Sequence, residues 1–439
     1  MADKALIKGF SRLTRDEKVK WLSDLLQDED TASFLARFRL NDTTQQERFE
    51  SFSENTLSNY HLPWGLVPNV MIDGVLYHVP LVIEESSVVA AASKASSFWA
   101  ARGGFITQSI STIKIGQLHF FYEGDKDAFH QSWISICEKL LLSAEPLTDN
   151  MRKRGGGIVG LKFLQVEGMP SNYYQLELKA ETKDSMGANF INSVLEHFGK
   201  ALPKIISDAV GVSQTEVLMA ILSNHTPGCT VKMQVHCPVE QLTWNKEMEP
   251  ARFAKRMKLA ADLAWHDIAR AVTHNKGIYN GVDAVVLATG NDFRAVEAAG
   301  HAFAAKDGRY RSLSRVNLTE KEFALELEIP LALGTVGGLT KLHPLAAKSL
   351  QILGNPDAAT LMKISAALGL ANNFSAMASL VTTGIQQGHM KMHLQNILHS
   401  LDVDKALWPL VDKHFEGLTI SVSAVREYVS QLQPRNPQN

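Results

Sequence analysis

The sequence has few cysteines, almost no net charge and no long apolar run. Its three cysteines, Cys137, Cys229 and Cys237, form no C-x-x-C pair, which excludes a disulfide framework and favours a reducing compartment. A net charge of −2 over 439 residues gives no overall field that would attract nucleic acid or an anionic membrane. The first residues lack the apolar segment of a signal peptide. We therefore expect a cytoplasmic protein with no nucleic-acid or membrane partner.

The richest apolar stretch covers residues 364–381. It is interrupted by Asn372 and Asn373, so it falls short of the roughly 18 uninterrupted apolar residues of a membrane-spanning helix. The whole chain is 45% hydrophobic and 21% charged, which is typical of a globular protein. The stretch is therefore predicted to be a core helix.

The order of the expected elements predicts an α+β protein in three parts. Residues 110–221 follow the pattern β-α-β-β-α-β, which is typical of a small split-βαβ, or ferredoxin-like, antiparallel sheet with helices on one side. This unit would be inserted into a large mixed helix and strand domain, made of residues 1–109 and 222–375. Residues 376–439 contain amphipathic helices after two glycines and predict a mobile C-terminal flap.

The stretch from Thr273 to Ala295 has an apolar run between polar ends, which predicts a buried strand or a short buried helix. It would follow a long helix over residues 251–271. Lys276 and Asp292 lie near the two ends of the stretch. Buried charges are rare unless they are paired. A Lys–Asp pair in a cleft could polarise a carbonyl group, and a structural ion pair is the alternative.

Two glycine-containing segments could bind a nucleotide. Residues 155–160 match G-x-G-x-x-G, but the dinucleotide fingerprint needs a strand before it and a helix after it, so we expect a hinge there. Residues 184–189, D-S-M-G-A-N, follow an expected strand and lead into a helix. Gly187 would allow a phosphate to approach the helix N-terminus. A plain helix cap fits this segment equally well.

Two further segments carry candidate acids. Glu84 and Glu85 precede a helix expected over residues 88–101, with Ser86 or Ser87 as its N-cap; acids at that place are more often structural than catalytic. His389 and His393 have zinc-ligand spacing, but Met390 replaces the glutamate of the metalloprotease motif. We therefore expect no metal, and interpret His389 as a general acid on the flap or as a surface histidine.

Together these segments resemble the class II 3-hydroxy-3-methylglutaryl-coenzyme A reductases, the soluble enzymes found in bacteria. The resemblance extends from about residue 10 to about residue 400, and it rests on six segments that occur in the family's order. They are E-N (54–55) with L-P (62–63), P-L-V-I-E-E-S-S-V-V-A-A-A-S (80–93), D-S-M-G-A-N (184–189), T-H-N-K-G-I-Y-N-G (273–281), A-T-G-N-D-F-R-A-V-E-A (288–298) and G-H-M-K-M-H (388–393). The family reduces hydroxymethylglutaryl-CoA to mevalonate and free CoA by two hydride transfers.

The resemblance implies roles for three groups of residues. Lys276 would be the cation that stabilises the oxyanion, and Glu85 would be the proton donor. Asp292 would complete their network, and His389 would protonate the CoA thiolate. The residues that hold the hydroxymethylglutaryl group would be Ser87, Arg270, Asn280 and Asn373. Arg12 would lie near the CoA phosphates. The nucleotide-binding residues would be Asp184, Met186, Gly187, Asn189 and Asn224.

The resemblance also implies a nicotinamide cofactor and a homodimer, possibly a higher oligomer, with the active site at the interface. NAD-using members carry an aspartate before the triple glycine, and Asp149 is near that place. Arg152, Lys153 and Arg154 follow it and would suit a 2′-phosphate, so we favour NADPH over NADH. Two other functions are considered: oxidation of mevalonate with NAD, and non-catalytic binding of a CoA ester.

Overall fold

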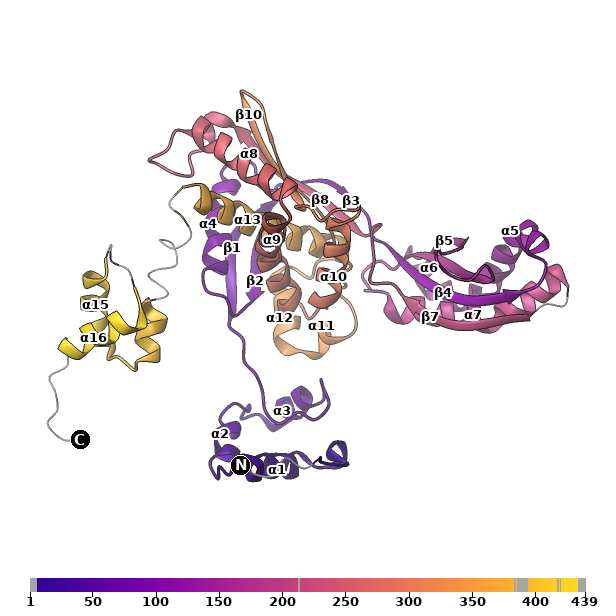
Figure 1. The fold of residues 1–439 in the computed structure, drawn as a ribbon, viewed down its shortest axis with the longest axis horizontal. Helices are drawn as coiled ribbons and strands as arrows, with labels where there is room; N and C mark the ends of the chain where they lie inside the picture. Colours follow the sequence, from indigo (N-terminus) through magenta and orange to yellow (C-terminus); the bar gives the residue numbers. More distant parts are fainter. Residues whose placement is uncertain are drawn as a thin grey trace.

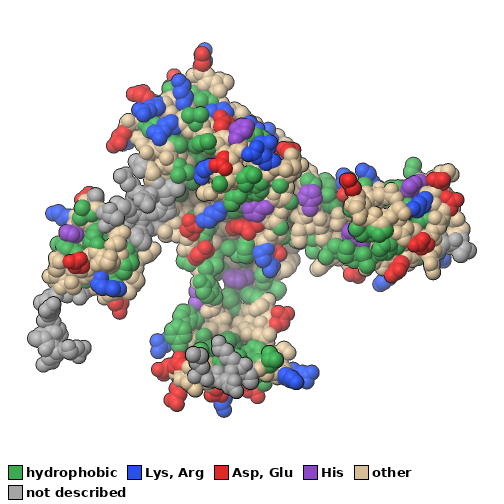
Figure 2. Space-filling view, in the orientation of Figure 1, with side chains coloured by type: hydrophobic (Ala, Val, Ile, Leu, Met, Phe, Trp, Pro, Cys, Tyr) green, Lys and Arg blue, Asp and Glu red, His purple; other side chains and the backbone are tan. Residues whose placement is uncertain are grey.

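A computed structural model describes residues 6–211, 214–382, 384, 394–416, 418 and 420–432. Figure 1 shows a large central part, with a smaller sheet-containing unit on one side and helical groups formed by the two ends of the chain. Acidic and basic side chains are interspersed over the visible face in Figure 2. This distribution agrees with the near-zero net charge of the sequence.

The large part is built around α13 (Ala358–Val381), a 24-residue helix. Among the described residues it is the one helix long and apolar enough to cross a membrane, but 83% of its apolar window is buried inside the protein. A helix that is apolar on all sides and buried in this way is a core helix. The predicted core helix is confirmed, and it continues through Asn372 and Asn373 without a break.

Helix α9 (Ile268–Ala288) crosses α13 at close range. A Cβ on Gly281 would lie 2.2 Å from the carbonyl oxygen of Leu368, and a Cβ on Gly369 would lie 2.7 Å from Val282 Cγ2. Glycine at these two positions therefore allows the two backbones to approach. The crossing brings the polar residues of α9 next to the two asparagines of α13.

Of the two predictions for the apolar run within residues 273–295, the buried helix is confirmed and the strand is wrong. The helix is longer than predicted, because α9 has 21 residues and begins before Thr273. The long helix predicted over residues 251–271 is present but is broken at Asp267, where α8 (Pro250–His266) has ended and α9 begins. Asp267 adopts an extended conformation, and its side chain caps the start of α9 by accepting from Ala269 N–H. This cap separates the two helices.

Two antiparallel sheets surround these helices. The hairpin of β1 (Trp64–Ile72) and β2 (Val75–Val82) turns at Asp73 and Gly74, both with positive φ, as the sequence predicts. α4 (Val88–Ala100) follows and packs on β1. The second sheet has the order β3 (Ile106–Ile110), β8 (Thr230–Pro238), β10 (Glu322–Pro330), β9 (Ser314–Leu318). The remaining elements of this part are η2 (Val239–Gln241), α10 (Phe293–Ala304), α11 (Leu339–Leu342) and α12 (Pro344–Ile352).

The smaller unit has its own sheet and its own core. Its elements in chain order are β4 (Ile113–Glu123), α5 (Lys126–Ser143), α6 (Glu145–Lys153), β5 (Gly157–Leu164), β6 (Tyr173–Glu181), α7 (Ala188–Val210) and β7 (Gln214–Leu222). The strand order is β5-β6-β4-β7, and every pair is antiparallel. The expected strands and helices are present. Helix α6 is an additional helix that the predicted β-α-β-β-α-β pattern does not include.

The two ends of the chain form small helical groups. The N-terminal group contains η1 (Phe10–Arg12), α1 (Arg15–Leu26), α2 (Thr31–Ala36) and α3 (Thr43–Glu50). The C-terminal group contains helical residues 394–400, η3 (Lys405–Leu407), α15 (Trp408–His414) and α16 (Val422–Leu432). Leu398, Val411 and Val425 form the centre of a separate apolar core there. His389 and His393 lie outside the described residues.

Candidate active site

The first half of α9 presents polar side chains at intervals of three and four residues, which places them on one helix face. This face, the start of α4 and the C-terminal half of α13 enclose a cavity of about 500 Å³. Its lining includes Glu85, Ser87, Lys94, Arg270, His274, Lys276, Asn280, Asn372 and Asn373. The structure therefore brings together six of the residues that the sequence predicts for catalysis and substrate binding.

Lys276 forms an ion pair with Glu85 at the edge of this cavity. The side chains are 61% and 39% exposed, so the prediction of a buried lysine is wrong for the single chain. Glu85 lies two residues before Ser87, which is the N-cap of α4 and has a φ of 74°. The carboxylate thus lies near the positive end of a helix dipole and beside an ammonium group.

A buried polar network forms the floor of the cavity. His274, Ser314 of β9 and Asn373 of α13 are linked by three contacts between 2.6 and 3.1 Å. Burial and, to a lesser extent, the charge of Arg270 lower the pKa of His274 to about 3, so its imidazole is neutral at physiological pH. Sequence reasoning missed His274 as part of the site, although its spacing from Arg270 on one helix face indicates the same cavity.

Asp292 lies elsewhere. It is the N-cap of α10, accepts from the N–H groups of Arg294 and Ala295, and pairs with Arg294 at 3.0 Å. Burial raises its pKa, but the hydrogen bonds and charge of Arg294 outweigh this, and the pKa is lowered. The predicted pair between Lys276 and Asp292 is therefore absent within one chain. From Lys276 to Ala288, the end of α9, the distance is about 18 Å at 1.5 Å per residue.

The segment 184–189 lies at the same end of α9 as Asp292. The Asp184 carboxylate accepts from Ala358 N–H at 2.9 Å, and its carbonyl oxygen accepts from Thr335 N–H at 2.8 Å. Gly334 N–H donates to Asn291 Oδ1 at 2.8 Å. A Cβ on the same glycine would lie 2.6 Å from Met186 N. Residues 184–189, the predicted nucleotide segment, are thus hydrogen-bonded to the large part of the protein, close to Asp292.

Gly187 precedes α7 with a φ of 96°. A Cβ at this position would lie 2.6 Å from Thr182 Cγ2, so the backbone conformation and the space both require glycine. The first N–H groups of α7, at Ala188 and Asn189, have no carbonyl partner within the helix and could face an anion. These features fit the phosphate part of a nicotinamide nucleotide.

The other predicted binding residues are not brought to the cavity. Arg12 ends η1 in the N-terminal group, and Asn224 is exposed after β7. In α6, Asp149 pairs with Lys153 at 2.7 Å, and Arg154 Nε donates to the carbonyl oxygen of Asn150 at 3.1 Å. Asp149 is therefore partly neutralised by a neighbour on its own helix.

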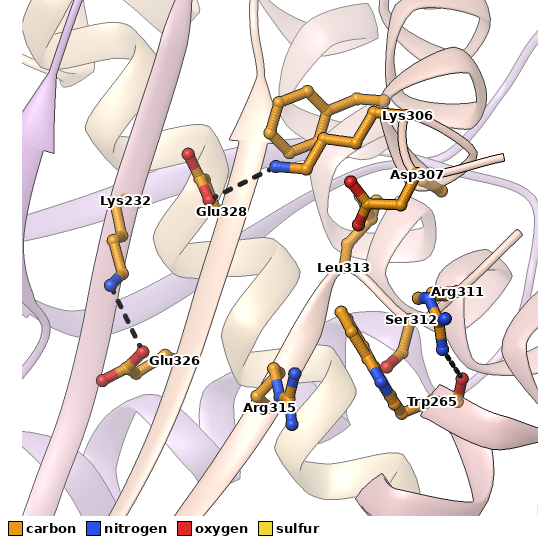
Figure 3. Close-up of a pocket in the computed structure, with 12 residues that line it drawn as sticks. Lys232, Trp265, Lys306, Asp307, Arg311, Ser312, Leu313, Arg315, Glu326 and Glu328 are labelled. Carbon is orange, nitrogen blue, oxygen red and sulfur yellow. Dashed lines mark hydrogen bonds and ion pairs between the residues drawn. The ribbon is translucent and has the colours of Figure 1, made fainter. Parts of the chain in front are cut away.

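A second cavity, of about 170 Å³, lies on the outer face of β8, β9 and β10 (Figure 3). Two of its lysines pair with carboxylates, Lys232 with Glu326 at 3.4 Å and Lys306 with Glu328 at 3.8 Å. It contains none of the predicted site residues, so the larger cavity is the candidate active site. Within the described part of the chain, no group of three His, Cys, Asp or Glu side chains could hold a metal ion.

The chain is similar to known proteins over most of its length. The hydroxymethylglutaryl-coenzyme A reductase family profile matches residues 14–394. A 3-hydroxy-3-methylglutaryl-coenzyme A reductase from Archaeoglobus fulgidus is 33% identical over 394 residues, covering 89% of this chain and 86% of that protein. A class II reductase structure from Streptococcus pneumoniae, bound to NADPH in open conformations, is 36% identical, with a TM-score of 0.71, and covers 85% of this chain and 99% of that one. Another structure of the reductase from the same organism is 34% identical, with a TM-score of 0.72, and covers 97% and 99%.

Proposed function

Because the chain belongs to the hydroxymethylglutaryl-coenzyme A reductase family, an oxidoreductase family of the mevalonate pathway, we propose that its reduction of 3-hydroxy-3-methylglutaryl-CoA takes place in the 500 Å³ cavity. The ion pair between Lys276 and Glu85 at the edge of this cavity is the observation that carries the proposal. It places a cation and a proton carrier next to each other, at a site large enough for an acyl group.

Lys276 would act on the thioester carbonyl. The carbonyl oxygen gains negative charge as hydride arrives from the bound nicotinamide, and a fixed ammonium stabilises that charge more than it stabilises the substrate. Glu85, in contact with Lys276, would deliver a proton to the same oxygen. Asp292 would complete this network, and His389 on the flap would protonate the departing CoA thiolate.

The cavity is suited to an acid with a hydroxyl group. Arg270 supplies a charge for the carboxylate of the hydroxymethylglutaryl group, and Asn280 and Asn373 supply amide groups. Charged and bidentate contacts of this kind fix the orientation of a carboxylate. Ser87 lines the same cavity, and Arg12 would contact the CoA phosphates. Lys94, which also lines it, is a cation that the sequence reasoning did not single out.

We further propose that residues 110–221 are the nucleotide-binding domain, inserted into a large domain of residues 1–109 and 222–375. Asp184, Met186, Gly187, Asn189 and Asn224 would contact the nucleotide. NADPH is favoured over NADH for two reasons. The similar Streptococcus pneumoniae enzyme binds NADPH, and the pairing of Asp149 with Lys153 weakens its repulsion of a 2′-phosphate.

The active form would be at least a homodimer. Lys276 and Glu85 lie beside the first half of α9, whereas Asp292 and residues 184–189 lie beyond its last residue. A hydride can be transferred only between groups in contact, so one chain supplies two separated half-sites. A second copy, placed with its nucleotide end against the substrate end of the first, would complete each site. We propose that this assembly is soluble and cytoplasmic, with residues 376–439 as the flap.

The test is to mix purified protein with hydroxymethylglutaryl-CoA and either NADPH or NADH, and to follow nicotinamide oxidation by absorbance. We expect turnover, faster with NADPH at limiting concentrations. Lys276→Ala should lower kcat about 100-fold or more, the loss typical of a removed oxyanion-stabilising group. The oxidative direction is measured with the same protein by adding mevalonate, CoA and NADP⁺ or NAD⁺, and by following reduction of the nicotinamide.

The matched control is Lys306→Ala, which removes an exposed lysine paired with Glu328 in the other cavity. Its activity should stay close to that of the wild type. Absence of turnover with both nucleotides in both directions would contradict the enzymatic proposal. It would leave the binding of a CoA ester without catalysis as the remaining function.

A further inference from the structure

The floor of the cavity contains two side chains to which the proposed reaction gives no role. His274 is 4% exposed and Ser314 is fully buried, and both contact Asn373, which is 1% exposed. Ser314 Oγ donates to Asn373 Oδ1 at 2.7 Å and lies 2.6 Å from His274 Nε2. Asn373 Nδ2 lies 3.1 Å from the same His274 nitrogen. Buried polar groups in such a network restrict one another's orientation.

The distances determine where the protons are. The hydroxyl of Ser314 has one hydrogen, and it goes to Asn373 Oδ1. Ser314 Oγ lies 2.6 Å from His274 Nε2. Lone pairs on both atoms would repel strongly at this distance, so Nε2 must carry the ring proton and donate to Ser314 Oγ. The order of donors is therefore His274, Ser314, Asn373. Asn373 Nδ2 lies 3.1 Å from Nε2, which carries a proton in this arrangement and cannot accept from it. The amide N–H that points away from the ring is then left for an acceptor in the cavity, which Asn373 lines.

The imidazole is held in this neutral form. Burial opposes a charge on His274, and the neighbouring guanidinium of Arg270 opposes it further. His274 Nδ1 is buried and has no hydrogen-bond partner among the described residues. A second ring proton would therefore lack an acceptor as well as facing a positive charge. The ring can thus act as a fixed donor through Nε2.

The segment that carries Ser314 is held from both sides. On the inner side, Leu313 N–H donates to Asn275 Oδ1 and Asn275 Nδ2 donates to the Arg311 carbonyl oxygen, both at 2.9 Å. On the outer side, Figure 3 shows Arg315 beside Trp265, with its guanidinium 3.9 Å from the centre of the indole ring. Ser314 therefore has little freedom to move away from Asn373.

We propose that His274 and Ser314 are positioning residues that hold the amide of Asn373 in one orientation, with its oxygen toward Ser314 and one N–H toward the substrate. The pocket then selects an oxygen acceptor at this point, such as a carboxylate or hydroxyl oxygen of the hydroxymethylglutaryl group. This inference rests on the proposed function. It adds that the orientation of Asn373 is set by two neighbours, of which His274 also lines the cavity and Ser314 does not.

The test is Ser314→Ala, which removes the donor to Asn373 Oδ1. KM for hydroxymethylglutaryl-CoA should rise about tenfold, the effect of one misplaced hydrogen bond, with little change in kcat or in KM for the nicotinamide. Asn373→Asp keeps the acceptor for Ser314 but loses the N–H groups, and it should raise the same KM at least as much. The double variant should be no worse than Asn373→Asp alone, because both changes remove one interaction.

Two comparisons separate this role from general loosening. His274→Gln retains an N–H that can donate to Ser314 and should keep a lower KM than His274→Leu. Ser365→Ala removes a buried hydroxyl of α13 that donates only to Leu361 of its own helix, at 2.9 Å, and should leave KM unchanged. An unchanged KM in Ser314→Ala, or equal rises for both substrates, would overturn the inference. An inactive wild-type protein would instead overturn the proposed function, and this inference with it.

Discussion

At the residue scale, two buried groups respond to pH in opposite directions. Burial and Arg270 lower the pKa of His274 to about 3, so below pH 6.5 the unfolded chain binds a proton that the folded protein does not. This lowers the free energy of unfolding as pH falls. Burial and the neighbouring Glu297 raise the pKa of Asp283 to about 8. The folded protein therefore keeps a proton there, which stabilises it as pH falls below 8.

His274→Gln isolates the first effect. At pH 5 the uptake of a proton by His274 in the unfolded chain costs the wild type about 2 kcal/mol, at 1.36 kcal/mol per pH unit below 6.5. The variant lacks this penalty, while Asp283 contributes equally to both proteins. Between pH 7.5 and pH 5, urea unfolding should therefore show the stability of the variant improving by that amount relative to the wild type. Parallel pH profiles would show that His274 is protonated in the folded protein.

The structure brings six of the site residues predicted from sequence to one cavity, and it leaves the predicted pair of Lys276 and Asp292 apart. Glu85, Ser87, Arg270 and Asn373 share a cavity with Lys276. Glu85, Ser87 and Lys276 belong to short segments that can be recognised from their letters, whereas Arg270 and Asn373 lie outside those segments. The pair of Lys276 with Asp292 failed because the two residues are separated by most of a helix. The contact of His274 with Ser314 joins α9 to a distant strand, and no local pattern of the sequence reports such a contact.

At the scale of elements, the crossing of α9 and α13 depends on glycine. Gly281 and Gly277 are one turn apart on α9 but have different surroundings. A Cβ on Gly281 would lie 2.2 Å from the Leu368 carbonyl oxygen, whereas a Cβ on Gly277 would lie 4.0 Å from Ala376 Cβ, an ordinary contact. The two positions therefore form a matched pair in one helix.

Gly281→Ala should lower the free energy of unfolding by about 1–3 kcal/mol, because the helices must move apart to admit the methyl group. Gly277→Ala should leave stability unchanged or raise it by up to about 1 kcal/mol, because alanine favours the helix. Urea unfolding followed by circular dichroism measures both. A Gly281→Ala variant as stable as Gly277→Ala would contradict the close crossing.

The elements were predictable where a local signal marks their ends. Asp73-Gly74 indicates the hairpin turn, and Ser87 was one of two expected N-caps of α4. The bounds of α9 were missed because residues 268–271 were assigned to the preceding helix, and the polar residues from Thr273 to Lys276 were interpreted as the end of a short buried element. Those residues face a cavity, so they are polar for a functional reason. The break at Asp267 depends on a side-chain cap that other aspartates in the chain could equally have formed.

At the scale of the whole molecule, the proposed homodimer, with a substrate cavity along the first half of α9 and a nucleotide segment beyond its last residue, predicts complementation between inactive variants. Lys276→Ala damages the substrate end, and Asp184→Ala damages the nucleotide end. In a mixed dimer one site would contain both lesions, and the other would contain neither. If subunits exchange freely, half of the dimers are mixed, so the mixture should regain about a quarter of the wild-type activity.

The measurement is nicotinamide oxidation after the two inactive proteins are unfolded and refolded together. A mixture of two proteins that both carry Lys276→Ala is the control, and it should stay inactive. Sites complete within one chain would give no recovery in either mixture, and sedimentation would then show whether a dimer forms at all.

Helix α9 also limits how the length of this protein can change. Its first half faces the substrate cavity, and its last residues lead to Asn291 and Asp292 beside the nucleotide segment. One residue inserted between Asn280 and Ala288 would rotate everything beyond it by about 100° and advance it by about 1.5 Å. Both half-sites could not then keep their orientation. Insertions should be tolerated in exposed loops, such as residues 165–172 between β5 and β6, whereas α9 should keep its length in every functional variant obtained from an insertion library.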